Sequence, residues 1–137
     1  MLLLELLVLE AVEQIELDIV FRVRSRGTPR CPSCSGSEVS YHSTYVRRLR
    51  DLPWQGQLVQ VQVKTRRLRC RNRHCPRKIF AERLPGVTAR QARETNRLTQ
   101  TLRRVGYVLG GLPGSRLLQQ MGMVASGDTI LRRVKTT

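Results

Sequence analysis

The sequence predicts an α+β protein with a β-rich domain over residues 1–86 and a helical domain over residues 87–137. Three observations support this division. Apolar and polar residues alternate in the first domain, as they do in strands that bury one face. Beyond Thr88 the apolar residues recur at helical spacing. All four cysteines lie in the first domain, where a small core with few aromatic rings needs an additional source of stability.

The clearest strand is predicted over residues 57–70, where Val59, Val61 and Val63 are separated by glutamines. Three further candidates flank it in the sequence. They are residues 12–23, which fit either one half-buried strand or a tight hairpin near Asp18, residues 39–46 before a turn at Leu52-Pro53, and a short edge strand within residues 78–85. The β-rich domain is therefore expected to be a small sheet.

The first helix of the second domain is predicted to begin at Thr88, because Thr88 and Gln91 have the spacing of a capping box. It carries one apolar stripe at helical intervals, formed by Leu98, Leu102, Val105 and Leu109. The glycine pair at 110–111 is expected to end this helix.

A second, shorter helix is expected from Pro113 or Gly114 to Met121, and Gly122 is expected to stop it. Its inward face is predicted to consist of Leu117, Leu118 and Met121. A third helix is expected after Ser126, whose hydroxyl can cap it. The core face of this third helix is predicted to consist of Ile130, Leu131 and Val134.

Residues 114–135 fit a helix-turn-helix, because two short helices flank a glycine-containing turn and the second of them is basic. The connecting turn GMVAS is longer than the tightest form of this motif. An ordinary helical hairpin that only packs against its neighbours is the alternative.

The formal charge of +15 is concentrated after residue 20. Residues 1–20 contain five acidic residues and no lysine or arginine, whereas residues 21–137 contain all 25 basic residues against five acidic ones, a local net charge of +20. Arginine outnumbers lysine by 22 to 3, and the guanidinium group forks onto phosphate and onto guanine edges. This distribution favours a polyanionic partner over a merely solvated surface.

The N-terminal stretch MLLLELLVLE is leader-like, but it has no basic n-region, it contains Glu5 and Glu10, and no small-residue cleavage site follows it. No apolar run approaches the length that spans a membrane. We therefore expect a cytoplasmic protein without a membrane partner, in which thiols stay reduced and paired cysteines indicate metal binding. The leucines of this segment also allow a role in assembly, in which copies of the chain pair through them as a homo-oligomer.

The four cysteines form two close pairs, Cys31-Pro-Ser-Cys34 and Cys70-x4-Cys75. Each pair can supply two thiolates from one tight loop, and tetrahedral Zn²⁺ needs four such ligands. Two pairs borne by hairpins therefore predict a zinc ribbon with one structural Zn²⁺, whose binding free energy contributes to folding. Four unrelated buried thiols are the alternative.

His74 makes the fourth ligand ambiguous, because Cys70 and His74 also have a workable spacing. Two observations favour Cys75. It would otherwise be a free thiol beside arginines, where oxidation is favoured, and a proline follows it, as one follows Cys31. His74 is then expected to face solvent or phosphate.

Basic residues in two regions are candidates for contacts with a nucleic acid. On the second cysteine loop, the residues expected to face a phosphate backbone are Arg69, Arg71, Arg73, Arg77 and Lys78. In the helical domain, those expected to position phosphate are Arg103, Arg104 and Arg116. On the third helix, those expected to face solvent or the major groove are Ser126, Gly127, Asp128, Thr129, Arg132 and Arg133. Arg132 or Arg133 can fork onto a guanine or a phosphate, and Thr129 can contact either.

Four segments together carry a family resemblance: RCPSC, YHSTYVRRLRDLPWQGQ, RRLRCRNRHCPRKIFAERLPG and GSRLLQQMGMVASGDTILRRV. They resemble the N-terminal part of the bacterial insertion-sequence transposases of the IS-L-three family, over nearly the whole chain from about residue 10. The run RLRDLPW followed by C-x4-C-P-R-x-I-F-x-E is the most specific part. The resemblance implies Cys31, Cys34, Cys70 and Cys75 as zinc ligands and Trp54 as the tryptophan of the turn motif. It also implies that a zinc-binding domain and a helix-turn-helix together recognise the terminal inverted repeats of the element.

One departure from the family concerns catalysis. Members continue into a catalytic domain whose three metal-binding carboxylates would cleave and join DNA by two-metal chemistry. After Leu52 this chain has three acidic residues, Glu82, Glu94 and Asp128, too few and too scattered for such a set. We therefore expect the double-stranded-DNA-binding portion of a transposase, not an enzyme and without a small-molecule substrate, at the nucleoid. An excised part, a truncated reading frame and a repurposed small protein all fit.

Two other functions compete with this one. A basic zinc ribbon also suits RNA or a ribosome-associated role, and a stand-alone DNA-binding regulator would have the same parts. The helix-turn-helix discriminates against the RNA hypothesis, because it predicts duplex DNA as the partner and a defined target sequence.

Overall fold

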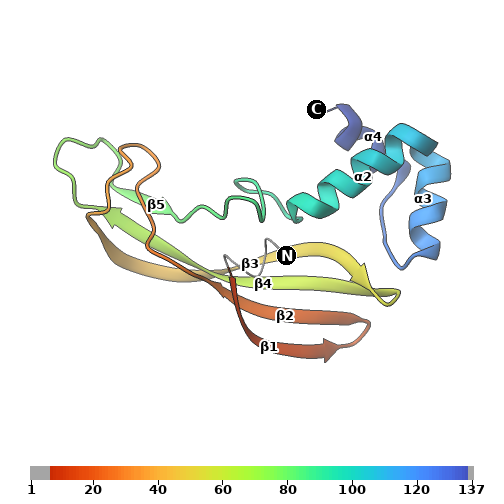
Figure 1. Cartoon of the computed structure of the whole chain (residues 1–137), viewed down its shortest axis with the longest axis horizontal. Coiled ribbons are helices and arrows are strands. Elements are labelled where there is room, and N and C mark those ends of the chain that lie inside the picture. Colours follow the sequence, from red (N-terminus) through yellow and green to blue (C-terminus); the bar gives the residue numbers. More distant parts are fainter. Residues whose placement is uncertain (1–6, 136–137) are drawn as a thin grey trace.

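A five-stranded sheet and three helices make up residues 7–135, the part of the chain that this computed structural model describes (Figure 1). The strands are β1 (Leu7–Ile15), β2 (Asp18–Ser25), β3 (Val39–Trp54), β4 (Gln57–Cys70) and β5 (Ile79–Ala81). The helices are α2 (Asn96–Leu109), α3 (Gly111–Gln120) and α4 (Gly127–Lys135). The α+β class predicted from the sequence is confirmed. Within residues 7–135, none of the helices combines the length and the apolar character needed to cross a membrane.

The sheet has the strand order β1-β2-β4-β3, and β5 pairs with the far end of β4. β1 and β2 form a tight antiparallel hairpin, so the hairpin near Asp18 is the correct alternative for residues 12–23. β2 runs parallel to β4, whereas β3 and β5 run antiparallel to it. The strand predicted over residues 57–70 and the short strand within residues 78–85 are both confirmed as β4 and β5.

β3 is twice as long as the strand predicted over residues 39–46, and the predicted turn at Leu52-Pro53 is wrong. The chain turns instead at Gln55 and Gly56, which both have positive φ, 51° and 75°. Two such residues suit the tight hairpin that joins right-twisted strands. Proline is tolerated near the end of β3 because β3 lies at the edge of the sheet and its pairing is irregular between Asp51 and Trp54.

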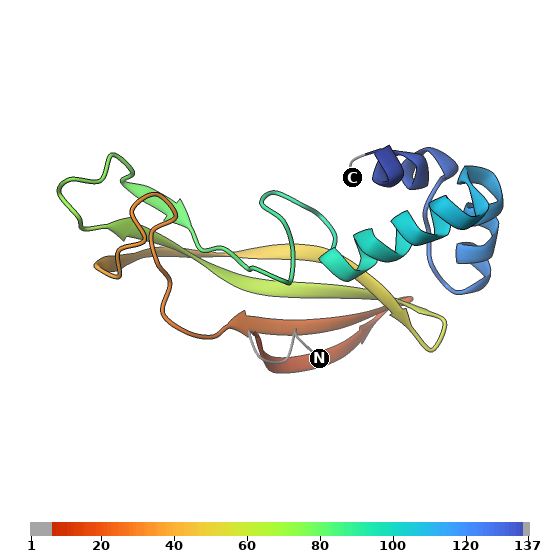
Figure 2. The same ribbon diagram turned by 45° about the horizontal axis from the view of Figure 1, so that its top comes forward.

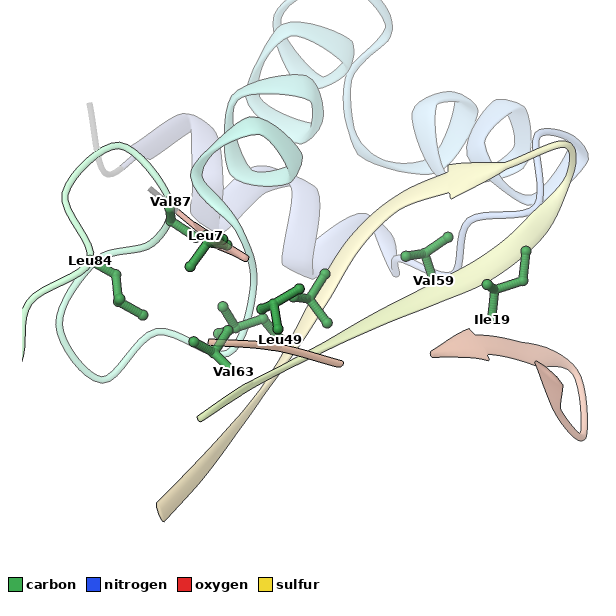
Figure 3. Close-up of a cluster of buried hydrophobic side chains, with 9 residues drawn as sticks. Leu7, Ile19, Leu49, Val59, Val63, Leu84 and Val87 are labelled. Atoms are coloured by element: carbon green, nitrogen blue, oxygen red, sulfur yellow. The ribbon is translucent and has the colours of Figure 1, made fainter. Parts of the chain in front are cut away.

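The main core lies on one face of the sheet, where valines of β4 meet apolar residues of the neighbouring strands (Figure 3). Leu49 and Val63 are fully buried there. The irregular segment between β5 and α2 closes this core from above, because its Leu84 and Val87 belong to the same cluster. The segment is therefore packed on the sheet rather than being a free linker.

The first helix begins later than predicted. Thr95 is the N-cap of α2, and its side-chain oxygen accepts a hydrogen bond from the backbone N–H of Leu98. Thr88 is buried before the helix and donates to the carbonyl of Glu94 at 2.7 Å, so the capping box of Thr88 and Gln91 is wrong. The tertiary structure overrides that local pattern, since β3 holds the segment through backbone bonds from Arg50 to residues 93 and 95.

The three helices pack around Leu98, Leu102, Leu118 and Ile130. Gly110, with φ 76°, ends α2 as predicted, and the Ser126 hydroxyl accepts from the Thr129 N–H as the predicted cap of α4. The predicted core positions Leu109, Leu117, Met121 and Leu131 are 39 to 50 % exposed, so these assignments are wrong. Met123, in the turn after α3, is buried in their place because the short helices present only one face to α2.

Two ion pairs join the helices to the sheet side of the molecule. Asp51 of β3 is 4 % exposed and accepts hydrogen bonds from the Thr95 hydroxyl at 2.7 Å and from Arg97 Nε at 2.8 Å. Glu94 accepts a hydrogen bond from Arg133 Nε of α4 at 2.8 Å. As a result the helices stand over one end of the sheet and the cysteine loops lie at the other (Figures 1 and 2).

Candidate metal centre and basic surface

The four cysteines meet at the end of the sheet that is remote from the helices. Cys31 and Cys34 lie in the connection between β2 and β3, Cys70 ends β4, and Cys75 lies in the loop before β5. The Sγ atoms of Cys31 and Cys75 are 3.7 Å apart, as are those of Cys34 and Cys70, and all four lie within 4.8 Å of one another. Four sulfurs at about 2.3 Å from one Zn²⁺ in tetrahedral geometry would be about 3.8 Å apart. The cluster therefore fits a single tetrahedral ion.

Local hydrogen bonds shape the two loops that carry these cysteines. In the first loop the N–H of Ser35 donates to the carbonyl of Cys31 at 2.8 Å. In the second loop the N–H of Cys75 donates to the carbonyl of Asn72 at 3.1 Å. Leu68 and Phe80 are buried beside the sulfurs and form a small separate core with them. Each loop thus presents two sulfurs from a tight turn.

The thiols differ in how readily they ionise. Burial opposes ionisation of Cys31, but the backbone N–H groups of Cys34 and Ser33 lower the pKa of this thiol to about 6. For Cys70 the N–H of Asn72 favours the thiolate, yet burial and the neighbouring sulfurs raise the pKa of this thiol to about 12. All four sulfurs can be thiolates together at neutral pH only when a cation compensates their charge, and Zn²⁺ is such a cation.

Cys75 and not His74 belongs to this group of four. The side chain of His74 is exposed and lies outside the cluster. The backbone N–H of His74 donates a hydrogen bond to Asn72 Oδ1 at 3.0 Å. His42 lies exposed on β3 with its ring hydrogen-bonded to Ser43 at 2.9 Å. Among residues 7–135, the four cysteines are the one group of three or more potential ligands that lie together.

Residues 27–75 match a family model described as the zinc-finger of transposase IS204/IS1001/IS1096/IS1165. Residues 27–75, a little over a third of the chain, are thus similar to the zinc ribbon of these insertion-sequence transposases. The resemblance noted from the sequence is thus confirmed for this region, which contains all four cysteines. No curated protein and no solved structure matches the chain.

The zinc ribbon holds one structural zinc ion, as predicted. Four thiolates fill the tetrahedron and leave no position for a water or a substrate, so the ion stabilises the fold and does not activate a reactant. The ion fixes the relative position of the two cysteine loops. In the sequence, 35 residues lie between Cys34 of the first loop and Cys70 of the second.

The second cysteine loop carries its predicted basic residues at the surface. Arg69, Arg73 and Lys78 are exposed. Arg71 is also exposed, and its Nε donates to Ser40 Oγ at 2.9 Å. Arg77 is half-buried and donates to Ser33 Oγ of the first loop at 2.7 Å. This set, which we call the knuckle arginines, consists of Arg69, Arg71, Arg73 and Arg77, with Lys78 beside them.

The predicted residues of the helical region differ in their availability. Arg104, Arg116 and Arg132 are exposed, and Arg132 lies beside Thr129, to whose hydroxyl its Nη2 donates at 3.4 Å. Ser126 is exposed at the start of α4 and Thr129 is half-buried. Arg103 donates to the carbonyl of Arg133 at 3.0 Å, and Arg133 is paired with Glu94. Arg103 and Arg133 therefore hold the helices together in this structure.

Several residues that organise the surface could not be predicted from the sequence. Asp51 is the acidic residue of the RLRDLPW run, and its position there was the only local indication of its importance. Arg47, Arg67, Arg83 and Arg90 line a cleft with Arg77. In a chain with 22 arginines, no sequence pattern distinguishes these four from the others.

Proposed function

We propose that this chain is a DNA-binding portion of an insertion-sequence transposase and that it recognises the terminal inverted repeats of the element. The observation that carries the proposal is the match of residues 27–75 to a transposase zinc ribbon. The charge supports it, because a net charge of +15 favours a polyanion and arginine suits phosphate and guanine. The knuckle arginines are proposed to contact phosphates, since the ion holds their loop in one shape.

Base recognition is proposed for a helix-turn-helix formed by α3 and α4. Leu118 and Ile130 are buried between these helices, and residues 121–126 connect them. Arg132 and Thr129 are the proposed base contacts, with Ser126 beside them and Arg104 and Arg116 on phosphates. Arg103 and Arg133 are proposed to act indirectly, because their guanidinium groups are engaged with other parts of the protein.

We assign this part of the protein a binding role rather than a catalytic one. Glu82 and Glu94 are engaged with Arg66 and Arg133, and Asp128 stands apart in the first turn of α4. Within residues 7–135 these carboxylates form no group that could hold two metal ions.

Selection of bound duplexes from a random DNA pool tests the proposal. We expect one sequence to be enriched, and we expect structured RNA to compete poorly with it. Equal competition by RNA would favour the ribosome- or RNA-associated alternative. The affinity for the selected duplex should fall steeply with salt, because phosphate contacts release counterions; a flat salt dependence would contradict the charge argument.

We also propose that two copies of the chain pair through β1, which would bring two DNA ends together. β1 is an edge of the sheet and hydrogen-bonds only to β2 among the described strands. Leu9, Val12 and Ile15 are 42 to 50 % exposed on it. Glu10 and Glu13 are paired with basic residues of β2 and β4, which reduces repulsion between two copies of this edge.

Light scattering tests this pairing with a matched pair of variants. Val12→Lys should lower the mass to that of a monomer, whereas Leu17→Lys, in the exposed turn beyond the edge, should not. A wild-type monomer, or an unchanged mass of Val12→Lys, would refute it. The N-terminal leucines were predicted from the sequence to pair copies of the chain. Those before residue 7 lie outside the described residues, and Leu7 is buried in the sheet core.

A further inference from the structure

An open basic cleft of about 440 Å³ lies over the sheet between β5 and the segment that leads to α2. Its floor is formed by side chains of β3 and β4, and its wall by residues 79–85 and 88–91. Figures 1 and 2 show β5, this segment and the helices on the same side of the sheet. The cleft therefore opens on the side of the molecule where both the cysteine loops and the helices stand.

The cleft is lined by five arginines and a single acidic residue: Arg47, Arg67, Arg77, Arg83, Arg90 and Glu82. The charge of Glu82 is already compensated, because its buried carboxylate accepts from Arg66 Nη2 at 3.0 Å and from the Arg66 backbone N–H at 2.8 Å. The positive charges of the cleft arginines are consequently not compensated by Glu82. The resulting positive potential attracts an anion that carries more than one charge.

The side chains of three of these arginines form no hydrogen bond or ion pair within residues 7–135. They are Arg67, Arg83 and Arg90, and all three side chains are exposed. The guanidinium carbon of Arg67 lies over the ring of Tyr45, 4.2 Å from the ring centroid. A cation–π contact of this kind holds the guanidinium against the ring without occupying its N–H groups.

The other two arginines support the walls of the cleft. Arg47 donates to the carbonyl oxygens of Ala89 and Ala92 at 3.1 and 2.7 Å, which holds the segment above the sheet in place. Arg77 donates to Ser33 and lines both this cleft and the surface of the second cysteine loop. The cleft and the surface formed by the knuckle arginines therefore join at Arg77 and form one continuous basic surface.

We propose that this cleft is a second site for the DNA phosphate backbone, in which Arg67, Arg83 and Arg90 bind phosphates between the zinc ribbon and the helices. The openness of the cleft to solvent along the sheet suits a continuous polymer, and its arginines point to phosphate rather than to base edges. The inference rests on the proposed DNA binding and adds to it a site for the backbone that neither the ribbon nor the helices supply.

The test compares two double variants that remove the same charge. Arg83→Gln with Arg90→Gln removes two cleft arginines whose side chains form no hydrogen bond or ion pair within the described chain. The control, Arg22→Gln with Arg48→Gln, removes two arginines from the opposite face of the sheet, where both lie beside Gln62 in the strand register. Arg22 is paired with Glu13 at 3.4 Å, and loss of this exposed pair should lower stability only slightly. Thermal unfolding should be unchanged in the cleft variant.

The measurement is the dependence of DNA affinity on salt for the selected duplex and for a scrambled one. The cleft variant should lower the slope of log affinity against log salt by about 2, one unit for each lost phosphate contact, with both duplexes affected alike. The control should keep the slope of the wild type. Equal slopes in the two double variants would overturn the cleft proposal while leaving DNA binding intact, whereas a wild type that binds no duplex would overturn the proposed function itself.

Discussion

Replacing Asp51 by asparagine should weaken the joint between the sheet and the helices. The buried carboxylate accepts hydrogen bonds from the Thr95 hydroxyl and from two nitrogens of Arg97. Each hydrogen bond to a charged group contributes about 1.5–3 kcal/mol, but the side chain of Arg97 is 48 % exposed and solvent screens its share. Asparagine keeps one acceptor oxygen. We therefore expect the free energy of unfolding to fall by about 2–3 kcal/mol at pH 7.

The effect of Asp51→Asn should depend on pH. Burial raises the pKa of Asp51, but the hydrogen bonds from Arg97 and Thr95 lower it more, so that it lies below its ordinary value of 3.8. A carboxyl whose pKa is lower in the folded state stabilises the fold above its unfolded pKa and loses this contribution as the pH falls through the folded pKa. The difference between wild type and variant should thus be full at pH 7 and shrink below about pH 4.

Urea unfolding followed by the fluorescence of Trp54, the one tryptophan of the chain, measures this difference. Trp54 lies three residues from Asp51 on the same strand, so its signal reports on the joint. Asp18→Asn is the control, because its pair with Arg50 lies nearer the surface and should be worth about 1 kcal/mol at most. A variant within about 0.5 kcal/mol of the wild type at pH 7, or a difference that persists unchanged at low pH, would refute the reasoning.

Three further predictions concern the ion, the helices and the DNA. Removal of zinc by a chelator, or the substitution Cys70→Ser, should unfold the ribbon end of the sheet while the helices persist. Hydrogen exchange measures this, and a uniform loss of protection over the whole protein would argue against a local role for the ion. Gly106→Ala should lower stability in urea by about 1–3 kcal/mol, because the added Cβ would lie 2.5 Å from Val134 Cγ2; unchanged stability would mean that α2 and α4 do not pack this closely. Arg132→Ala should lower the binding free energy for the selected duplex by about 1–3 kcal/mol and leave that for a scrambled duplex unchanged. Arg71→Ala should weaken binding to both duplexes alike, and titration of each variant with the two duplexes distinguishes these outcomes.

The elements that can be predicted from this sequence are those whose local pattern and tertiary surroundings have the same requirement. β4 was predicted over its full length because alternating valines need one buried face, which the sheet provides. The zinc site was predictable for a similar reason, since each cysteine pair lies in one tight loop and the ion requires two such loops.

The errors fall where long-range contacts decide the local structure. Thr88 and Gln91 have the spacing of a capping box, but the segment is held against β3 and its Thr88 is buried, so the helix starts at Asn96. The short helices likewise have more apolar residues than the core can accommodate, and packing against α2 and α4 together buries Leu118 rather than Leu117. No periodicity within a ten-residue helix contains that information.

The length of β4 constrains how the two ends of the molecule can share one DNA. The strand covers 14 residues, and at about 3.3 Å per residue it separates the cysteine end from the hairpin end by about 43 Å. The helices lie at the hairpin end, where Gly122 packs against the backbone of Gly56. One turn of B-DNA is about 34–36 Å long. If the ribbon and the helices bind one duplex, that duplex must therefore exceed one turn, and the basic cleft lies over the part of the DNA between them. A duplex of about 10 base pairs should then bind through one end only and lose the salt dependence contributed by the other.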